Sequence, residues 1–369
     1  MCMAKQAGER VHSLDGLRGL GALIVLLFHI GVWASPFGPD LPYELVPGSA
    51  SVMVFFVLSG VVLSLAPFKH LKGAGYDWFG YFPRRIIRLG VPLAGAMVFG
   101  IVAGYASWRI GSSSRIALAV DFAGGADGIL HDLLMQFDFL FNVSDAGSTI
   151  FGTTFDRVNG PAWSMSWEIW FSLTLPIAIW CIARIRRVAP AVMAILVAVF
   201  ISHWTGYFPL RLCLMFWIGV LMARHFDRLK SIKIPPALEA LLLTAILVVL
   251  ELPQLIHSDG LAGAVLSSLM DAACALMVVI SVADGFTRRA LSSAPVLFLG
   301  KISYSLYLTH AIVIGSTRTL VPHIGIVDPL AIAGISIAAS FAFAIAFWRL
   351  VERPSISWSH SVGIAPQDS

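Results

Sequence analysis

The chain has 369 residues, of which 58% are hydrophobic and 12% are charged. A typical soluble domain carries about 25% charged residues, so this composition excludes an ordinary soluble protein. It predicts an all-α integral membrane protein, a polytopic helical bundle of about ten transmembrane helices. The net charge of +4 gives no sign of nucleic-acid binding. The four cysteines have no spacing typical of a metal site or a disulfide framework, and no metal is expected.

Ten hydrophobic stretches are long enough to cross a bilayer. The first is too long, and too polar at its end, for a cleaved signal peptide, and we interpret it as the first span. The split between the fifth and sixth spans depends on a short hairpin at Tyr207–Arg211. The predicted spans are residues 16–35, 50–68, 86–108, 162–183, 190–207, 209–225, 236–253, 262–284, 301–321 and 328–350.

Lysine and arginine are distributed unevenly over the connections between these spans. With a cytoplasmic N-terminus, 20 of the 25 lie on the inner side and five on the outer side. The positive-inside rule therefore predicts that both termini are cytoplasmic. Residues 1–354 are expected to form one domain, with residues 109–161 as an outer loop region and residues 355–369 as a short cytoplasmic tail. Acidic side chains of the outer loop are either solvated or bind sugar hydroxyls.

One ionisable side chain, His29, lies deep in the first span. It follows Arg18 by eleven residues, which returns to nearly the same helix face about 16 Å deeper. Asp15 shares that face. An ionisable group at this depth is a candidate functional residue. The alternative is that His29 hydrogen-bonds a neighbouring helix and that Arg18 anchors the span at the headgroups.

Three arginines fall within one turn at the start of the third span: Arg84, Arg85 and Arg88. Guanidinium groups donate in two directions and suit phosphate. Anchoring to anionic lipid is the alternative interpretation.

Two further spans carry polar groups at depth. Glu168 lies about one and a half turns into the fourth span from the outer side, where a carboxylate must be paired or line a wet cavity. In the ninth span Ser303, Tyr307 and His310 follow the spacing i, i+4, i+7 and share one stripe. Interhelical hydrogen bonding and a direct catalytic role are both compatible with that stripe.

Together these motifs resemble the acyltransferase-3 family of bacterial membrane acyltransferases, many of which O-acetylate cell-surface polysaccharides. One departure concerns Ile169 and Trp170, where the family commonly carries a Glu and a Gln. The matching stretches occur in family order from the first span to the last. They are Leu14–His29, Phe55–Gly60, Arg84–Arg88, Trp163–Glu168, Ser303–His310 and Val351–Pro354.

The resemblance implies an O-acyltransferase of the bacterial inner membrane. Its co-substrate would be cytoplasmic acyl-coenzyme A, above all acetyl-coenzyme A, and its acceptor a hydroxyl of an exported or lipid-linked glycan. His29 would be the general base or a transient acyl carrier. The catalytic residues implied are His29, Glu168, Tyr307 and His310. The residues implied to bind the acyl-coenzyme A donor are Arg18, Arg84, Arg85 and Arg88. The residues implied to bind the acceptor substrate are Asp15, Trp163, Ser166 and Ser303.

Two other classes of protein remain as alternatives. A transporter of a small anionic solute would usually show inverted repeats or helices broken at corresponding positions, and the sequence shows neither. A structural or sensory membrane protein would need neither the arginine turn nor the deep histidine.

Overall fold

The computed structural model of the chain describes residues 11–34, 46–70, 76–111, 119–123, 126–137 and 159–362. Within these ranges the regular structure is helical, apart from a single bridge between Lys233 and Asp284. Nine of the described helices are long and apolar enough to cross a membrane. The predicted fold class is confirmed: the chain is an all-α, multi-pass membrane protein.

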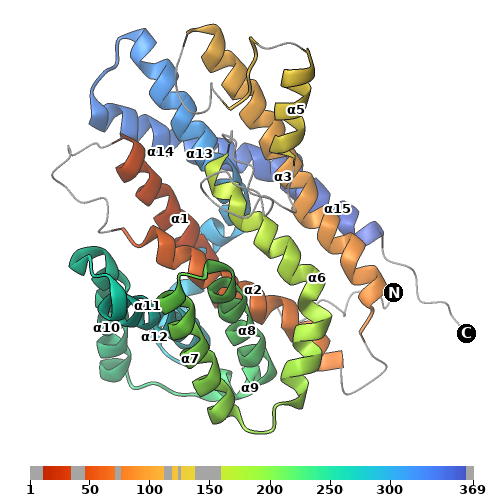
Figure 1. Cartoon of the computed structure of the whole chain (residues 1–369), viewed down its shortest axis with the longest axis vertical. Coiled ribbons are helices and arrows are strands. Elements are labelled where there is room, and N and C mark those ends of the chain that lie inside the picture. Colours follow the sequence, from red (N-terminus) through yellow and green to blue (C-terminus); the bar gives the residue numbers. More distant parts are fainter. Residues whose placement is uncertain are drawn as a thin grey trace, which may run out of the picture. The chain divides into compact units, whose positions relative to one another are not determined.

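The helices follow the predicted order along the chain (Figure 1). The predicted break between the fifth and sixth spans is confirmed, because α7 ends at Thr205 and α8 begins at Phe208. Helix α8, with 17 residues, is a little shorter than the nine long apolar helices. These nine helices and α8 are, in chain order, α1 His12–Ala34, α2 Gly48–His70, α3 Trp78–Arg109, α6 Trp163–Arg184, α7 Val188–Thr205, α8 Phe208–Arg224, α10 Pro236–Ile256, α11 Gly260–Val282, α13 Ala294–Leu320 and α14 Pro329–Phe347. The short ones are α5 Ala126–Gln136, α9 Phe226–Ser231, α12 Phe286–Leu291 and α15 Arg353–Ser361.

Helix α3 begins eight residues earlier than the predicted third span. Asp77 caps it, because the Asp77 carboxylate accepts a hydrogen bond of 2.8 Å from the Gly80 amide. The three arginines therefore lie in the second and third turns of a helix, rather than at its start. With 32 residues, α3 is about 48 Å long, well beyond the roughly 30 Å hydrocarbon core of a bilayer.

The C-terminal helix also runs further than predicted. After α14 the chain forms one π-helical turn, η4 (Trp348–Glu352), and continues as α15 to Ser361. Pro354 does not end the helix because it occupies the first turn of α15, where its missing N–H has no intrahelical partner to lose. The first part of the predicted tail is thus helical, and α15 packs along α3 (Figure 1).

The chain divides into two compact units that interleave in sequence. Unit 1 comprises Met1–Val25, Glu44–Tyr76 and Thr174–Lys301, and unit 2 comprises Leu26–Tyr43, Asp77–Leu173 and Ile302–Ser369. The expectation of a single domain over residues 1–354 stays a prediction.

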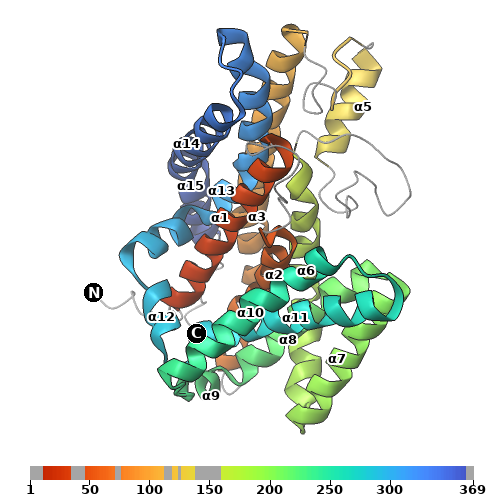
Figure 2. The same ribbon diagram turned by 90° about the vertical axis from the view of Figure 1, so that its left-hand side faces the viewer.

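Unit 1 is built on close contact between α2 and α8. A Cβ atom added at Gly60 would meet the backbone oxygen of Phe216, and one added at Gly219 would meet the backbone oxygen of Val57. Glycine is needed at both positions because lipid provides no hydrophobic drive between helices, so that association depends on close packing. Helix α11 packs against α2, α7 and α10, and the α10–α11 pair is visible side by side in Figure 2.

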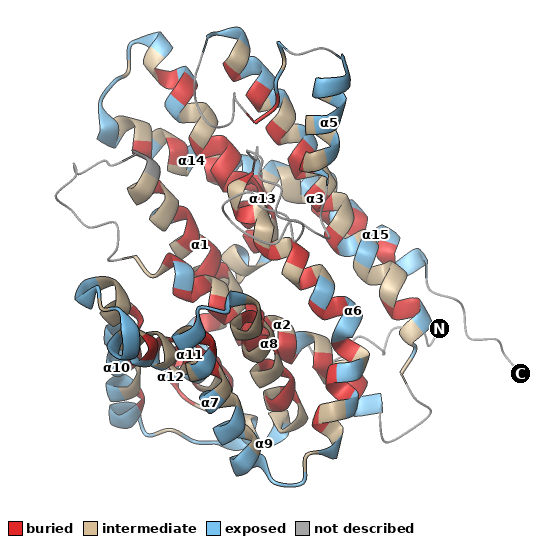
Figure 3. Cartoon of the chain, in the orientation of Figure 1, coloured by how far each residue is buried: buried red, intermediate tan, exposed pale blue. Residues whose placement is uncertain are grey.

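Unit 2 is built around the part of α13 that lies beyond Lys301, nearly all of which is buried as far as Ile314 (Figure 3). Leu308 of that helix joins Leu93, Ala96 and Met97 of α3 in one apolar cluster. The polar side chains predicted for the ninth span therefore sit inside protein, rather than against lipid.

Candidate active site

His29 of α1 and His310 of α13 form a direct pair in unit 2. Nδ1 of His29 lies 3.1 Å from Nε2 of His310, and the two ring centroids are 4.9 Å apart. His310 is completely buried and His29 is half-buried. The sequence placed both imidazoles at a similar depth in different spans, and the structure brings them into contact.

The backbone of α13 determines which nitrogen of each ring carries hydrogen. Nδ1 of His310 lies 3.1 Å from the Leu306 carbonyl oxygen and 2.9 Å from that of Tyr307. Because a carbonyl only accepts, we assign the hydrogen to Nδ1 of His310 and the lone pair to Nε2. That lone pair accepts from the Nδ1–H of His29. In the neutral pair, the lone pair of His29 is then on its Nε2 atom.

Tyr307 connects α13 to the beginning of α6. Its hydroxyl lies 2.8 Å from Oγ of Ser164 and donates to the Pro161 carbonyl oxygen over 3.2 Å. One residue further along α13, the Leu308 carbonyl accepts a hydrogen bond of 2.8 Å from the Asn159 side chain. The interhelical bonding that the sequence left open for this stripe is thus present at Tyr307. It also shows that α6 begins beside the middle of α13.

Glu168 of α6 forms an ion pair with Arg85 of α3. The pair is largely buried, with 11% and 13% of the two side chains exposed. Nε of Arg85 also donates to Oγ of Ser172 over 3.0 Å. Arg85 thereby supplies the partner that a carboxylate inside a membrane requires.

This ion pair corrects the predicted separation of Arg85 and Glu168. The sequence placed Arg85 near the inner surface and Glu168 near the outer one, a separation that no ion pair can span. Two features explain the error. Helix α6 begins beside the middle of α13, so the number of residues from the outer loop does not give the position of Glu168 relative to α3. Helix α3 begins at Trp78, eight residues before the predicted span, so Arg85 belongs to the helix and its side chain can face α6.

The arginine turn does not act as one group. Arg85 points inward to Glu168, whereas Arg84 forms an exposed pair with Asp77 at 3.3 Å, with 40% and 50% of the side chains exposed. Arg88, one turn after Arg84, is exposed as well. Arg84 and Arg88 therefore share an accessible face of α3, and Arg85 lies on the buried face.

The other predicted site residues are placed as follows. In unit 1, Asp15 and Arg18 form the expected charge pair on α1 at 3.4 Å. In unit 2, Ser166 and Ser303 are buried and Trp163 is half-buried at the start of α6. The functional roles assigned to all these residues stay predictions.

Sequence reasoning missed several polar partners within unit 2. Ser164 and Ser172 were not singled out, although the first stands inside the Trp163–Glu168 motif and the second follows Glu168 by one turn. The hydroxyl of Tyr304 donates to the Leu89 carbonyl oxygen over 2.9 Å. A serine or tyrosine in an apolar helix gives no sequence signal of which helix it will face.

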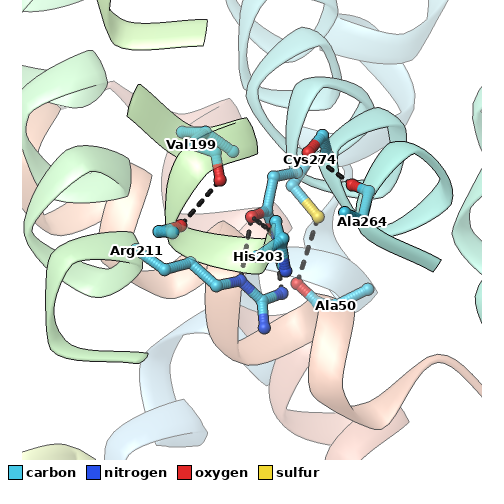
Figure 4. A network of polar contacts seen from close by, with 9 residues as sticks. Ala50, Val199, His203, Arg211, Ala264 and Cys274 are labelled. Atoms are coloured by element: carbon cyan, nitrogen blue, oxygen red, sulfur yellow. Dashed lines mark hydrogen bonds and ion pairs between the residues drawn. The ribbon is translucent and has the colours of Figure 1, made fainter. Parts of the chain in front are cut away.

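A second polar cluster lies in unit 1 and centres on Asp271 of α11. Arg211 of α8 donates to both carboxylate oxygens over 2.8 Å each, and Nε2 of His203 on α7 lies 2.9 Å from Oδ2 (Figure 4). Asp271 is 1% exposed. In the sequence, Asp271 is an acid within the eighth predicted span for which spacing indicates no partner, and Arg211 is one of the five cations on the predicted outer side.

Glu239 of α10 is the other acid for which the sequence offered no partner. Its fully buried carboxylate accepts hydrogen bonds from the backbone amides of Phe286 and Thr287, over 2.8 and 2.7 Å. It therefore caps the beginning of α12, which is a structural role. Among the described residues, no three His, Cys, Asp or Glu side chains converge in a way that could hold a metal ion.

Comparison with known proteins gives one match. The acyltransferase-3 family model, described as an acyltransferase domain, matches residues 11–349. No curated protein and no solved structure matches the chain.

Proposed function

Because the chain belongs to the acyltransferase-3 family and is a membrane acyltransferase, we propose that its donor is acetyl-coenzyme A and its acceptor a glycan hydroxyl. The acceptor would be an exported or lipid-linked glycan at the bacterial inner membrane. The observation that carries this proposal is the 3.1 Å contact between His29 and His310. General bases in enzymes are commonly imidazoles that a second group orients, so that the lone pair lies on a defined nitrogen.

In the transfer step, Nε2 of His29 takes the proton of the acceptor hydroxyl. The hydroxyl oxygen attacks the thioester carbonyl and forms a tetrahedral intermediate with a negative oxygen. When the intermediate collapses, the carbon–sulfur bond breaks and the thiolate of coenzyme A leaves. It receives the proton from the imidazolium of His29. The developing imidazolium is stabilised by its Nδ1–H bond to His310.

Tyr307 is the proposed donor to the negative oxygen. Its ring centroid lies 5.9 Å from that of His310, and its hydroxyl shares the Pro161 carbonyl with Ser164. An acyl group beside His29 would draw the Tyr307 hydrogen away from the 3.2 Å contact with Pro161, while Ser164 keeps that carbonyl paired. Hydrogen-bond donors aimed at developing negative charge commonly make the largest contribution to such catalysis.

Donor binding is proposed for the accessible face of α3. Arg84 and Arg88 would bind phosphates of coenzyme A, because the Arg84 side chain is 40% exposed, Arg88 is exposed, and the two lie one turn apart. Arg85 has a different role in this scheme: it holds Glu168, whose carboxylate would accept a hydrogen bond from the acceptor. Lys and Arg are concentrated in the loops on the predicted inner side of the membrane. This excess supports cytoplasmic termini and entry of the donor from the cytoplasm.

The test uses membrane vesicles from the host cells and acetyl-coenzyme A labelled in the acetyl group. We expect labelled ester in the glycan fraction that is released by mild alkali and is absent with His29→Ala. Labelled protein formed without acceptor would assign His29 as an acyl carrier instead of a base. A wild-type protein that leaves the donor intact while a labelled anion enters the vesicles would favour the transporter alternative and refute the proposal.

A further inference from the structure

Glu352, in the closing motif Val351–Pro354, has no part in the mechanism above. It ends the π-helical turn η4 and is 8% exposed. Its Oε2 atom accepts two hydrogen bonds from Ser305 of α13, over 3.1 Å from the amide nitrogen and 2.5 Å from the hydroxyl. Both donors thus belong to one residue of the helix that carries His310.

The local geometry directs this carboxylate at α13. A π-helical turn holds one more residue than an α-helical turn, and such turns are frequent at functional sites. Helix α3 packs tightly against the same turn: a Cβ added at Gly95 would lie 3.2 Å from Val351. A carboxylate within a membrane protein is costly unless it is paired. The π-helical turn therefore fixes the backbone of Glu352, and Ser305 fixes its carboxylate.

Ser305 begins the turn of α13 that orients His310. Its carbonyl oxygen accepts from the hydroxyl of Thr309 over 2.8 Å. The next two carbonyls, those of Leu306 and Tyr307, hold Nδ1 of His310. Glu352 thus binds Ser305, the two residues that follow Ser305 in the backbone hold His310, and His310 contacts His29.

We propose that Glu352 is a positioning residue for acyl transfer. By holding Ser305, it fixes the turn whose carbonyls keep hydrogen on Nδ1 of His310 and direct Nε2 of His310 at His29. This inference rests on the proposed function, since it concerns the same histidine pair. It assigns Glu352 no contact with either substrate.

The experiment measures kcat and the donor KM with labelled acetyl-coenzyme A, per mole of folded protein in vesicles. Because small misplacements of a catalytic group cost up to about 100-fold, we expect Glu352→Ala to lower kcat by roughly 10- to 100-fold. The donor KM should stay unchanged. Glu352→Gln should restore most of kcat, since an amide oxygen still accepts from Ser305. The matched control is Glu251→Ala in α10, a carboxylate within an apolar helix whose Oε2 has no hydrogen-bond partner among the described residues. Its kcat should equal that of the wild type.

A second measurement separates positioning from general loss of structure. In a His310→Ala background, Glu352→Ala should cause no further loss, because the residue through which it acts is gone. The radioactive label keeps this slow background rate measurable. Losses that multiply, or a Gln variant as inactive as the Ala variant, would overturn the inference. If the Glu352→Ala protein does not accumulate, Ser305→Ala is combined with His310→Ala instead. Losses of kcat that multiply in that double variant would also overturn the inference. A wild type without transfer refutes the proposed function instead.

Discussion

Two buried polar groups, one in each unit, satisfy their hydrogen bonds in different ways. In unit 1, Asp271 receives two bonds from Arg211 and one from His203, and opposite charges face each other directly. In unit 2, two backbone carbonyls orient the ring of His310, and Nε2 of that ring accepts a hydrogen bond from His29. In the first arrangement Arg211 and His203 pair both oxygens of the Asp271 carboxylate, which suits a structural role. The second directs the lone pair of His29 to one defined nitrogen, which suits proton transfer.

The two groups also differ in what their removal would cost. Breaking a buried ion pair leaves an uncompensated charge in a medium of low polarity. Truncating a neutral imidazole leaves no charge, so its structural cost is smaller. For these two groups the comparison therefore predicts a loss of activity without unfolding when the His29–His310 pair is altered, and unfolding without a specific loss of activity when the Asp271 cluster is altered.

The largest effect is expected for His29→Ala. A positioned general base contributes about 10²- to 10⁴-fold, so transfer per mole of protein should fall by at least about 100-fold. The melting temperature of the purified protein should change little. His203→Ala is the matched control in unit 1, and its transfer rate per folded molecule should remain close to wild type. Equal losses in both variants would remove the distinction between the two units.

Asp271→Ala should act on stability. Removal of one partner of a buried ion pair costs about 3–5 kcal/mol, because Arg211 is left buried without its counter-charge. Thermal unfolding in detergent measures the loss, and acetyl transfer of the fraction that stays folded should be normal. The double variant Asp271→Leu with Arg211→Met should recover most of the stability. A variant that is fully stable yet inactive would assign the Asp271 cluster to the reaction.

Arg88→Ala and Arg85→Ala should differ, although the two residues are one turn apart. Loss of a charge-assisted contact with phosphate should raise the donor KM of Arg88→Ala by an equivalent of about 1.5–3 kcal/mol. Arg85→Ala should instead lower kcat, because Glu168 loses its partner. Steady-state kinetics with varied acetyl-coenzyme A separates the two outcomes. An unchanged donor KM in a variant lacking both Arg84 and Arg88 would favour lipid anchoring.

The smallest effect on activity is expected for two reporter cysteines in unit 1, introduced at Ser231 and Asp259 in a background without native cysteines. Both positions are exposed at opposite ends of α10. An impermeant thiol reagent should label position 259 in intact cells and spare position 231, with normal transfer in both variants. The reverse pattern would invert the topology and place the arginine face of α3 outside.

The sequence identified candidate site residues wherever an ionisable side chain lies in an apolar helix, because burying such a group in a membrane costs free energy. His29, Glu168 and His310 stood out because ionisable groups are rare in apolar helices. Their partners were harder to predict. Arg85 is one of three arginines in a turn, and only its side-chain contacts in the folded chain show that it faces Glu168 while Arg84 and Arg88 face outward. Asp271 and Arg211 are 60 positions apart, on helices whose contact no periodicity reveals.

The sequence by itself determined the fold class, the order of the helices and the family, because each depends on composition or on short motifs along the chain. Tertiary structure alone decided the pairing of His29 with His310, the pairing of Glu168 with Arg85 and the contact of Glu352 with Ser305. The separation of Arg85 and Glu168 was mispredicted because counting residues from a loop assumes that each helix begins at the membrane surface. Helix α3 begins well before its apolar stretch, and α6 begins beside the middle of α13. Where a helix begins relative to its neighbours is set by side-chain contacts between helices distant in sequence, and these exist only in the folded chain.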